Sequence, residues 1–204
     1  IYAIYESAFR DCVELTDITI PDSVSHIDES AFAGCRSLDN IRIPDSVCII
    51  GSAAFRGCSM LSSVSYPSGE TDIPSLAFAD CSNLVSVLIP NTITAISDSA
   101  FRGCARLSSI TLPDNLSYLG HGVFADCINL NDIAIDENNP NFSVSGGYIL
   151  SKDGKTLIAG ANGNSPIPPS VTSIADFAFY GCKNIQSIII PNGIGEIGNY
   201  AFYG

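Results

Sequence analysis

The chain has 204 residues, 46% of them hydrophobic, which suffices for one folded domain. Its formal net charge of −12 disfavours nucleic acids and anionic membrane surfaces as partners, because both require clustered Lys and Arg. No apolar run approaches the ~20 residues of a membrane-spanning helix, so we expect these residues not to insert into a membrane.

A cysteine recurs every 23 residues through the first six members of a series that ends at Cys182. A phenylalanine lies three residues before each of these cysteines, and a further one, Phe202, follows Phe179 by 23 residues. A fixed period of this size predicts a solenoid, in which one short unit per period stacks on its neighbours. We number the coils by the cysteines at which they are expected to end: Cys12, Cys35, Cys58, Cys81, Cys104, Cys127 and Cys182, with a last coil that stops at Gly204. Because the period is already under way at residue 1, we expect 1–204 to be one solenoid within a longer chain.

Coil 2 illustrates the predicted elements. Residues 18–20 alternate apolar and polar side chains, which predicts a short strand. Pro21 follows and recurs in later coils, where its missing N–H ends the strand and turns the chain. Val24 and Ile27 predict a second short extended piece, and residues 30–35 predict a single helical or 3₁₀ turn with Phe32 pointing inward. Stacking therefore predicts a solenoid of short parallel β-strands with helical turns opposite and a spine of phenylalanines.

The repeating unit Leu-x-x-Ile-x-Ile-Pro-x-x-Val-x-x-Ile-x-x-x-Ala-Phe-x-x-Cys resembles the BspA-like class of bacterial leucine-rich repeats over essentially the whole chain. This resemblance implies a solenoid of the leucine-rich-repeat type that is extracellular, either secreted or displayed at the cell surface, often as an adhesin. It brings no catalytic residues with it, so we expect neither an enzyme nor a cofactor. The chain departs from the pattern at Glu70, where the Val position is polar, and at Asp136, where the proline is missing.

Residues 136–167 interrupt the period and form a predicted insertion. Within it, Asp153-Gly154 lies between two apolar runs, 142–150 and 155–159, which predicts a β-hairpin. Two interpretations stay open. The insertion either forms a binding loop on one face or is a hairpin that pairs with or shields the solenoid surface.

The cysteines and histidines give little indication of disulfides, catalysis or metal binding. Seven of the eight cysteines share one column, and their parallel Cβ vectors suit disulfide geometry poorly, so we predict buried free thiols. Cys48 lies outside that column and is predicted to be the most reactive thiol. The two histidines, His26 and His121, lie four coils apart and cannot form one catalytic group. No zinc or calcium ligand spacing is present in the sequence, so we expect no metal site.

The residue after each phenylalanine alternates between arginine and alanine along the first six coils. The next position carries Asp in coils 1, 4 and 6 and Gly in the coils between them. This pattern predicts ion pairs between coils, with Arg56 beside Asp80 and Arg102 between Asp80 and Asp126. An ancestral duplication of a two-coil unit would also explain the alternation.

The exposed strand positions are mostly Ser and Thr and lack the aromatic anchors that dominate tight protein interfaces. We therefore expect partner contact toward the C-terminal half, where tyrosines gather. The candidate contact residues are Tyr118, Tyr148, Tyr180, Tyr200, Tyr203 and Arg42. The leading hypothesis is a non-catalytic, adhesin-like binding module for an extracellular protein or glycan. The alternative is a passive stalk that displays another domain.

Overall fold

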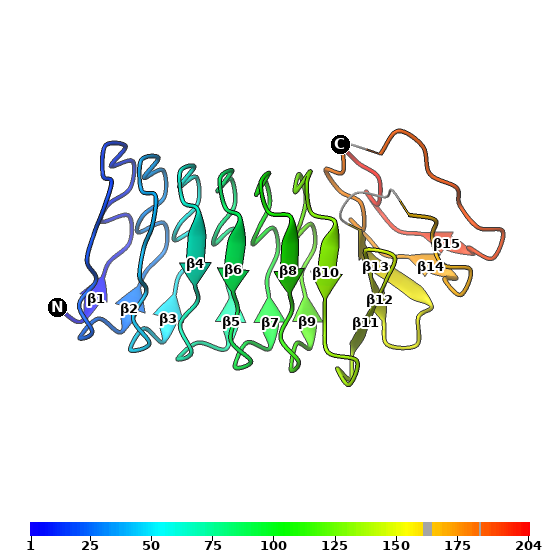
Figure 1. The fold of residues 1–204 in the computed structure, drawn as a ribbon, viewed down its shortest axis with the longest axis horizontal. Coiled ribbons are helices and arrows are strands. Elements are labelled where there is room, and N and C mark those ends of the chain that lie inside the picture. Colours follow the sequence, from blue (N-terminus) through cyan, green and yellow to red (C-terminus); the bar gives the residue numbers. More distant parts are fainter. Residues whose placement is uncertain (161–164, 184) are drawn as a thin grey trace.

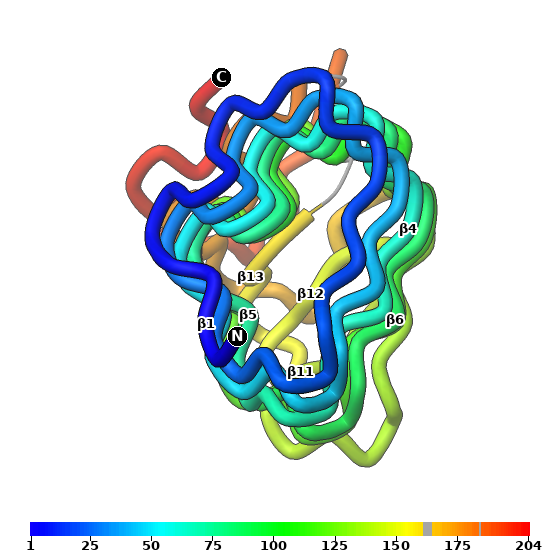
Figure 2. The backbone as a smooth tube through the Cα atoms, turned by 90° about the vertical axis from the view of Figure 1, so that its left-hand side faces the viewer, coloured from blue at the N-terminus to red at the C-terminus, as the bar shows by residue number. Residues whose placement is uncertain are grey.

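The computed structural model describes residues 1–160, 165–183 and 185–204. The chain forms an elongated β-solenoid of about eight coils, with the first strand at one end and the last at the other (Figure 1). Viewed from one end, the coils drawn in blue to green follow the same outline, and the red C-terminal segment departs from it (Figure 2). The predicted repeat solenoid of the leucine-rich-repeat type is confirmed.

Two sets of short parallel strands run along the solenoid, on opposite sides of the outline in Figure 2. The first set comprises β1 (Ala3–Ile4), β2 (His26–Ile27), β3 (Ile49–Ile50), β5 (Asp72–Ile73), β7 (Ala95–Ile96) and β9 (Tyr118–Leu119). The second set comprises β4 (Ser63–Ser65), β6 (Ser86–Leu88), β8 (Ser109–Thr111) and β10 (Asp132–Ala134). Paired residues lie one period apart, as in His26 with Ile49 and Val64 with Val87, so the repeat length sets the register.

The insertion adds three strands and joins the stack. It contains β11 (Phe142–Ser145), β12 (Tyr148–Ser151) and β13 (Thr156–Gly160), and the solenoid continues with β14 (Ser173–Ile174) and β15 (Glu196–Ile197). The predicted hairpin turn at Asp153-Gly154 is confirmed, and a second antiparallel turn at Gly146-Gly147 divides the run that was expected to be a single strand. Strand β13 pairs in parallel with β14, so the interpretation that the hairpin pairs with the solenoid is confirmed.

The predicted helical turn is wrong, since no helix occurs among the described residues. In coil 2, the N–H groups of Ala31, Ala33 and Cys35 donate to carbonyls three residues back. The intervening N–H groups, including those of Phe32 and Gly34, donate instead to carbonyls of coil 3. The segment is therefore a series of tight turns that also hydrogen-bonds to the next coil. A helix cannot continue here because the backbone is left-handed at two positions per coil, with φ of 55° at Ser30 and 76° at Gly34.

We call the outer surface of these turns the turn face. It is built in every coil from the residues equivalent to 30–34, and two of those positions form columns along the solenoid in which large side chains such as Arg10, Arg56 and Tyr203 are exposed. Ser30 and its equivalents form the first column, and Ala33 and its equivalents form the second.

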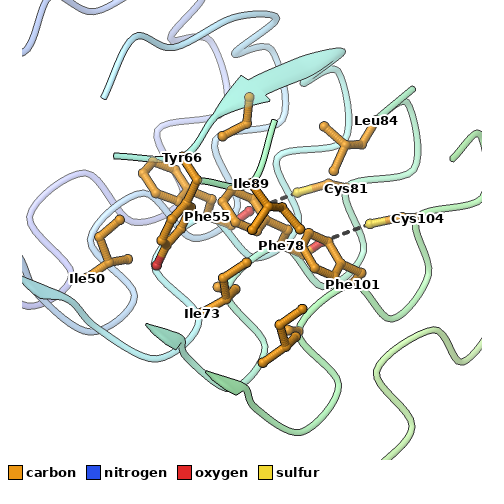
Figure 3. Close-up of a cluster of buried hydrophobic side chains, with 14 of the residues drawn as sticks. Ile50, Phe55, Tyr66, Ile73, Phe78, Cys81, Leu84, Ile89, Phe101 and Cys104 are labelled. Carbon is orange, nitrogen blue, oxygen red and sulfur yellow. Dashed lines mark hydrogen bonds between the residues drawn. The ribbon is translucent and has the colours of Figure 1, made fainter. Parts of the chain in front are cut away.

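The core is organised around stacked phenylalanine rings. From Phe9 to Phe124 the rings of six successive coils stack nearly parallel, with centroids 5.1 to 6.0 Å apart. Figure 3 shows three members of this spine among aliphatic side chains from both strand sets. The spine is interrupted after Phe124, where the insertion places Tyr148 edge-on to Phe179 at 5.8 Å, and it resumes between Phe179 and Phe202 at 4.9 Å.

The cysteine column lies beside the spine and is hydrogen-bonded. The Sγ of Cys81 donates to the carbonyl of Phe55 at 3.1 Å, and that of Cys104 to the carbonyl of Phe78 at 3.3 Å (Figure 3). Each buried thiol thereby ties one coil to the coil before it. All eight cysteines, which lie within the described residues, are free. The prediction of buried thiols is confirmed for five of the seven cysteines in this column, whereas Cys182 is partly buried and Cys12 is exposed, as is Cys48 outside the column.

Thiol reactivity should follow this burial. We expect a thiol reagent to modify Cys12 and Cys48 rapidly in the folded protein and the remaining six slowly. Burial raises the pKa of Cys35 to about 11 and that of Cys58 to about 12, so little reactive thiolate forms at neutral pH. Counting modified thiols by mass spectrometry checks this, and unfolding without reductant should release all eight. Recovery of fewer than eight would contradict the free-thiol column.

The first strand set is interrupted between β3 and β5. In an uninterrupted pair, the residue after the strand donates its N–H to the preceding coil, as Gly51 does to Ile27 at 2.7 Å. The equivalent residue after β5 is Pro74, which has no N–H to donate. Pro74 therefore removes one of the backbone hydrogen bonds that would join β3 to β5.

Two buried polar side chains bond to the backbone at this break. The Glu70 carboxylate accepts the N–H of Ile50, and the Tyr66 hydroxyl donates to the carbonyl of Asp72 at 3.0 Å. Glu70 and Tyr66 are 6% and 3% exposed, and burial raises the pKa of both groups. The departure at Glu70 noted in the sequence thus supplies a hydrogen-bond acceptor where the sheet lacks one.

Glu70 should make stability depend on pH. Because its pKa is higher in the folded protein than in the unfolded chain, its protonation favours folding. That contribution is complete below the unfolded value of about 4.3 and is lost as the pH rises through the folded value. We expect Glu70→Gln to gain stability relative to the wild type between pH 4 and pH 7, measured by urea unfolding at both pH values. Glu14→Gln, at an exposed position, is the control. If the difference in unfolding free energy between Glu70→Gln and the wild type were the same at pH 4 and pH 7, the expectation would be contradicted.

Candidate binding site

Four aromatic side chains form a cluster on the turn face of coils 7 and 8. Phe177 stacks on Tyr200 with ring centroids 5.3 Å apart, and Tyr180 stacks on Tyr203 at 5.7 Å. Edge-to-face contacts join the two stacks, at 5.7 Å between Phe177 and Tyr180 and 5.9 Å between Tyr200 and Tyr203. We call these four residues the aromatic cluster. Tyr200 and Tyr203 are each 61% exposed, so the cluster presents ring surface to solvent.

The cluster occupies the two outward columns of the turn face, which carry different residues in earlier coils. The first column holds Ser, Ala, Leu or Gly before Phe177, and the second holds Arg or Ala before Tyr180. The first column is also left-handed, with φ of 58° at Phe177 and 54° at Tyr200. The earlier coils are left-handed at this column as well, so the backbone belongs to the repeat, and the aromatic side chains are what distinguish coils 7 and 8.

A hollow of about 220 Å³ adjoins the aromatic cluster on its N-terminal side. Coil 6 carries the small residues Gly122 and Ala125 in the two columns of the turn face. Its surface is therefore recessed relative to coil 5 and coil 7, which carry larger side chains there. Arg102 of coil 5 lines one wall, and the rings of Phe177 and Tyr180 line the other. We call this hollow the slot. It combines aromatic surface with charged groups, an arrangement suited to a ligand that is apolar on one side and polar on the other.

His121 and Asp98 complete the slot. The His121 ring tilts against Phe177 with centroids 5.0 Å apart, and its Nδ1 lies 3.9 Å from the Asp98 carboxylate. The same carboxylate accepts the backbone N–H of His121 at 2.7 Å. These contacts hold the imidazole beside the rings, where it offers the ligand a second polar group.

The slot depends on contact between coils that the insertion separates in sequence. Residues 136–167 lie between coil 6 and coil 7, yet the N–H of Asp126 donates to the carbonyl of Gly181 at 3.2 Å. Lys183 Nζ also lies 2.8 Å from the Asp126 carboxylate. The turn faces of the two coils are therefore neighbours.

The predicted ion pairs form around Asp80. Arg56 and Arg102 each place a guanidinium nitrogen 3.4 Å from the same Asp80 oxygen, which confirms the prediction for both arginines. Asp126 pairs with Lys183 and not with Arg102, so that part of the prediction is wrong. All of these groups are at least partly exposed, and such pairs contribute only about 0–1 kcal/mol each.

The structure brings three of the six candidate contact residues together. Tyr180, Tyr200 and Tyr203 belong to the aromatic cluster. The other three, Tyr118, Tyr148 and Arg42, lie elsewhere.

Tyr148 is 1% exposed, and its hydroxyl donates to the carbonyl of Ser165. It packs in the core because the insertion folds inward, and it is no longer a candidate for partner contact. Tyr118 is half exposed on β9, and Arg42 pairs with Asp22 at 3.1 Å on the other strand side. Both are exposed but belong to neither the aromatic cluster nor the slot.

Phe177, His121 and Gly122 were missed in the sequence. A column-by-column comparison could have found Phe177, since it places an aromatic residue where earlier coils carry small or aliphatic ones. The same comparison would have shown that coil 6 carries small residues, Gly122 and Ala125, in both columns of the turn face. The role of His121 depends on its contact with Phe177 across the insertion, which no local pattern indicates.

The described residues contain no group of three or more His, Cys, Asp or Glu side chains that could hold a metal ion. Within the same residues, no helix is long and apolar enough to cross a membrane.

The architecture defines a protein class, the leucine-rich-repeat solenoid. Residues 2–131 and 163–204 match six copies of the BspA type leucine rich repeat region. The chain belongs to this family. Repeats of this type are generally non-catalytic scaffolds. No curated protein sequence matches the chain.

Solved structures of bacterial leucine-rich repeat proteins share the fold. A leucine rich cell surface protein from Faecalibacterium prausnitzii is 30% identical, with a TM-score of 0.82 over 99% of this chain and 55% of that protein. A leucine-rich repeat protein from Bacteroides ovatus is 26% identical, with a TM-score of 0.63 over 92% and 47%. The pneumococcal vaccine antigen PcpA is 21% identical, with a TM-score of 0.73 over 99% and 53%, a likeness of fold alone. The chain spans about half the length of these proteins.

Proposed function

We propose that the chain is a non-catalytic, adhesin-like binding module of a cell-surface or secreted protein. It contacts an extracellular protein or glycan through the aromatic cluster and the slot. The observation that carries the proposal is the exposed pair Tyr200 and Tyr203, stacked on two further rings beside a hollow with charged walls. Aromatic and arginine side chains that converge in this way dominate the energetics of binding surfaces.

Two further observations support this assignment. The large aromatic side chains of Phe177 and Tyr200 support a functional role, because Ser, Ala, Leu or Gly occupies the same column in the six earlier coils. The resemblance to a leucine rich cell surface protein supports the location. A passive stalk has no need for exposed aromatic rings, so the stalk hypothesis predicts that the cluster can be removed without consequence.

The test is binding to immobilised mucins and extracellular-matrix proteins. We expect the double variant Tyr200→Ser/Tyr203→Ser to lose at least tenfold in affinity, about 1.4 kcal/mol. The matched control is Tyr2→Ser/Tyr5→Ser, which removes two tyrosines that are 82% and 73% exposed at the other end of the solenoid. A wild type that binds none of these ligands, or equal losses in both double variants, would favour the stalk.

A further inference from the structure

A second hollow, of about 320 Å³, opens on the turn face at coils 1 to 3. Arg10, Arg36 and Arg56 line it, and its floor includes Ala33 and Gly34 of coil 2. As in the slot, a coil with small outward residues lies between two coils with large ones. We call this feature the arginine hollow.

The charge of the arginine hollow is opposite to that of the chain. The protein carries nine Lys and Arg against 21 Asp and Glu, yet three arginines converge here and Asp11 is the acidic residue among those lining the hollow. Arg10 Nε lies 3.6 Å from Asp11, and Arg56 reaches Asp80 through Nε at 3.4 Å. A guanidinium has five N–H donors, so these long single contacts leave most of them directed at solvent.

The turn face already shows what two arginines in alternate coils bind. Asp80 of coil 4 lies between Arg56 of coil 3 and Arg102 of coil 5, and both approach one carboxylate oxygen. Arg10 and Arg56 flank coil 2 in the same way, but the residue of coil 2 equivalent to Asp80 is Gly34. The Asp11 carboxylate of coil 1 reaches over Gly34, so this surface holds one acidic group against three arginines and retains an excess of positive charge for a ligand anion.

The main-chain groups of Ala33 and Gly34, which line the arginine hollow in coil 2, are already hydrogen-bonded within the solenoid. The N–H of Gly34 donates to the carbonyl of Arg56, and the carbonyl of Ala33 accepts the N–H of Asp11, both at 2.7 Å. The N–H of Ala33 donates to Ser30 at 3.0 Å. A peptide therefore cannot add to these residues as an extra strand, because strand addition requires free main-chain groups. A ligand must instead be bound by the arginine side chains.

We propose that the arginine hollow binds the carboxylate or sulfate groups of an acidic glycan. The planar guanidinium group pairs with both anions through two parallel hydrogen bonds. Arg10 and Arg56 lie two coils apart, roughly 10 Å by the strand spacing, which is about the span of a disaccharide. A polymer with at least one charge in every disaccharide matches that interval, and the small Ala33 side chain leaves space between the arginines.

This site lies at the opposite end of the turn face from the aromatic cluster and rests on separate observations. The arginine hollow can be correct if the aromatic cluster binds nothing, and the reverse also holds. The two sites are therefore tested with different variants.

The test compares binding of four soluble polymers at low ionic strength: chondroitin sulfate, hyaluronate, uncharged dextran and poly-L-glutamate. We expect chondroitin sulfate, hyaluronate or both to bind, dextran to fail, and the affinity to fall as salt is added. Arg10→Gln/Arg36→Gln should weaken binding at least tenfold. Both side chains are exposed, so the variant should keep the wild-type melting temperature. Binding by chondroitin sulfate alone assigns the ligand group as sulfate, and binding by hyaluronate assigns it as carboxylate.

Arg106→Gln is the control, since it removes one arginine charge from an exposed site outside the arginine hollow, where Arg106 contacts Asn83. It should change the affinity less than twofold, and so should Tyr200→Ser/Tyr203→Ser. An equal loss for Arg106→Gln would overturn the proposal, because it would show an effect of net charge alone. Poly-L-glutamate binding as tightly as the charged glycans would also overturn it, in favour of an acidic peptide. Absence of charged-glycan binding would overturn it as well.

Discussion

Replacing Phe101 with alanine should lower the free energy of unfolding by about 3–5 kcal/mol. The ring is fully buried and stacks between Phe78 at 5.6 Å and Phe124 at 6.0 Å. The neighbouring coils cannot close the cavity, because backbone hydrogen bonds fix their separation on both sides of Phe101. Chemical denaturation of the wild type and the variant measures the loss.

Phe202→Ala is the control for this prediction. Its ring is 38% exposed and stacks on Phe179 alone, so we expect a clearly smaller loss. A loss below about 1 kcal/mol for Phe101→Ala would contradict the stacked-spine account of stability.

The second large effect is expected at Gly160, where the insertion meets the solenoid. A Cβ at this position would lie 2.3 Å from Cε1 of Phe179 and 2.7 Å from its Cδ1. Gly160→Ala should therefore displace the Phe179 ring and cost about 1–3 kcal/mol, measured by chemical denaturation. Because Phe179 lies in the same coil as Phe177 and Tyr180, the variant should also weaken ligand binding at the aromatic cluster.

Gly193→Ala provides the matched control, since the nearest atom to its Cβ would be the Val171 carbonyl oxygen at 4.0 Å. We expect this control to be nearly neutral in both stability and binding. Adding Phe179→Leu to Gly160→Ala should recover part of the loss, because the shorter side chain vacates the space. Equal stability of Gly160→Ala and wild type would show that Phe179 moves freely.

Much of the fold could be predicted because a solenoid translates sequence spacing directly into contact. Residues one period apart become neighbours, so Phe78 had to meet Phe101 and Cys81 had to follow Cys58 in one column. The Arg56–Asp80 pair was predictable for the same reason. Each of these contacts joins adjacent coils, and no knowledge of distant parts of the chain is needed to place them.

The candidate site was less predictable, because it forms where the period fails. Tyr180, Tyr200 and Tyr203 were named as candidate contact residues and lie at the surface of late coils, yet Tyr148 was named with them although it is buried. Tyr148 lies in an insertion whose folding depends on pairing with β14, so its spacing from other aromatic residues carries no information about burial.

The sequence by itself determined the repeat, the register, the inward columns and the free thiols, because these follow from one unit stacked on copies of itself. Only the tertiary structure decided how the chain runs between the columns. It replaced the expected helical turn by left-handed turns at Ser30 and Gly34, since hydrogen bonds to the next coil are available there. It also decided that coil 6 and coil 7 meet across the insertion, which places Phe177 against His121 and creates the slot. That contact joins residues separated by an irregular segment, and its geometry is set by packing rather than by period.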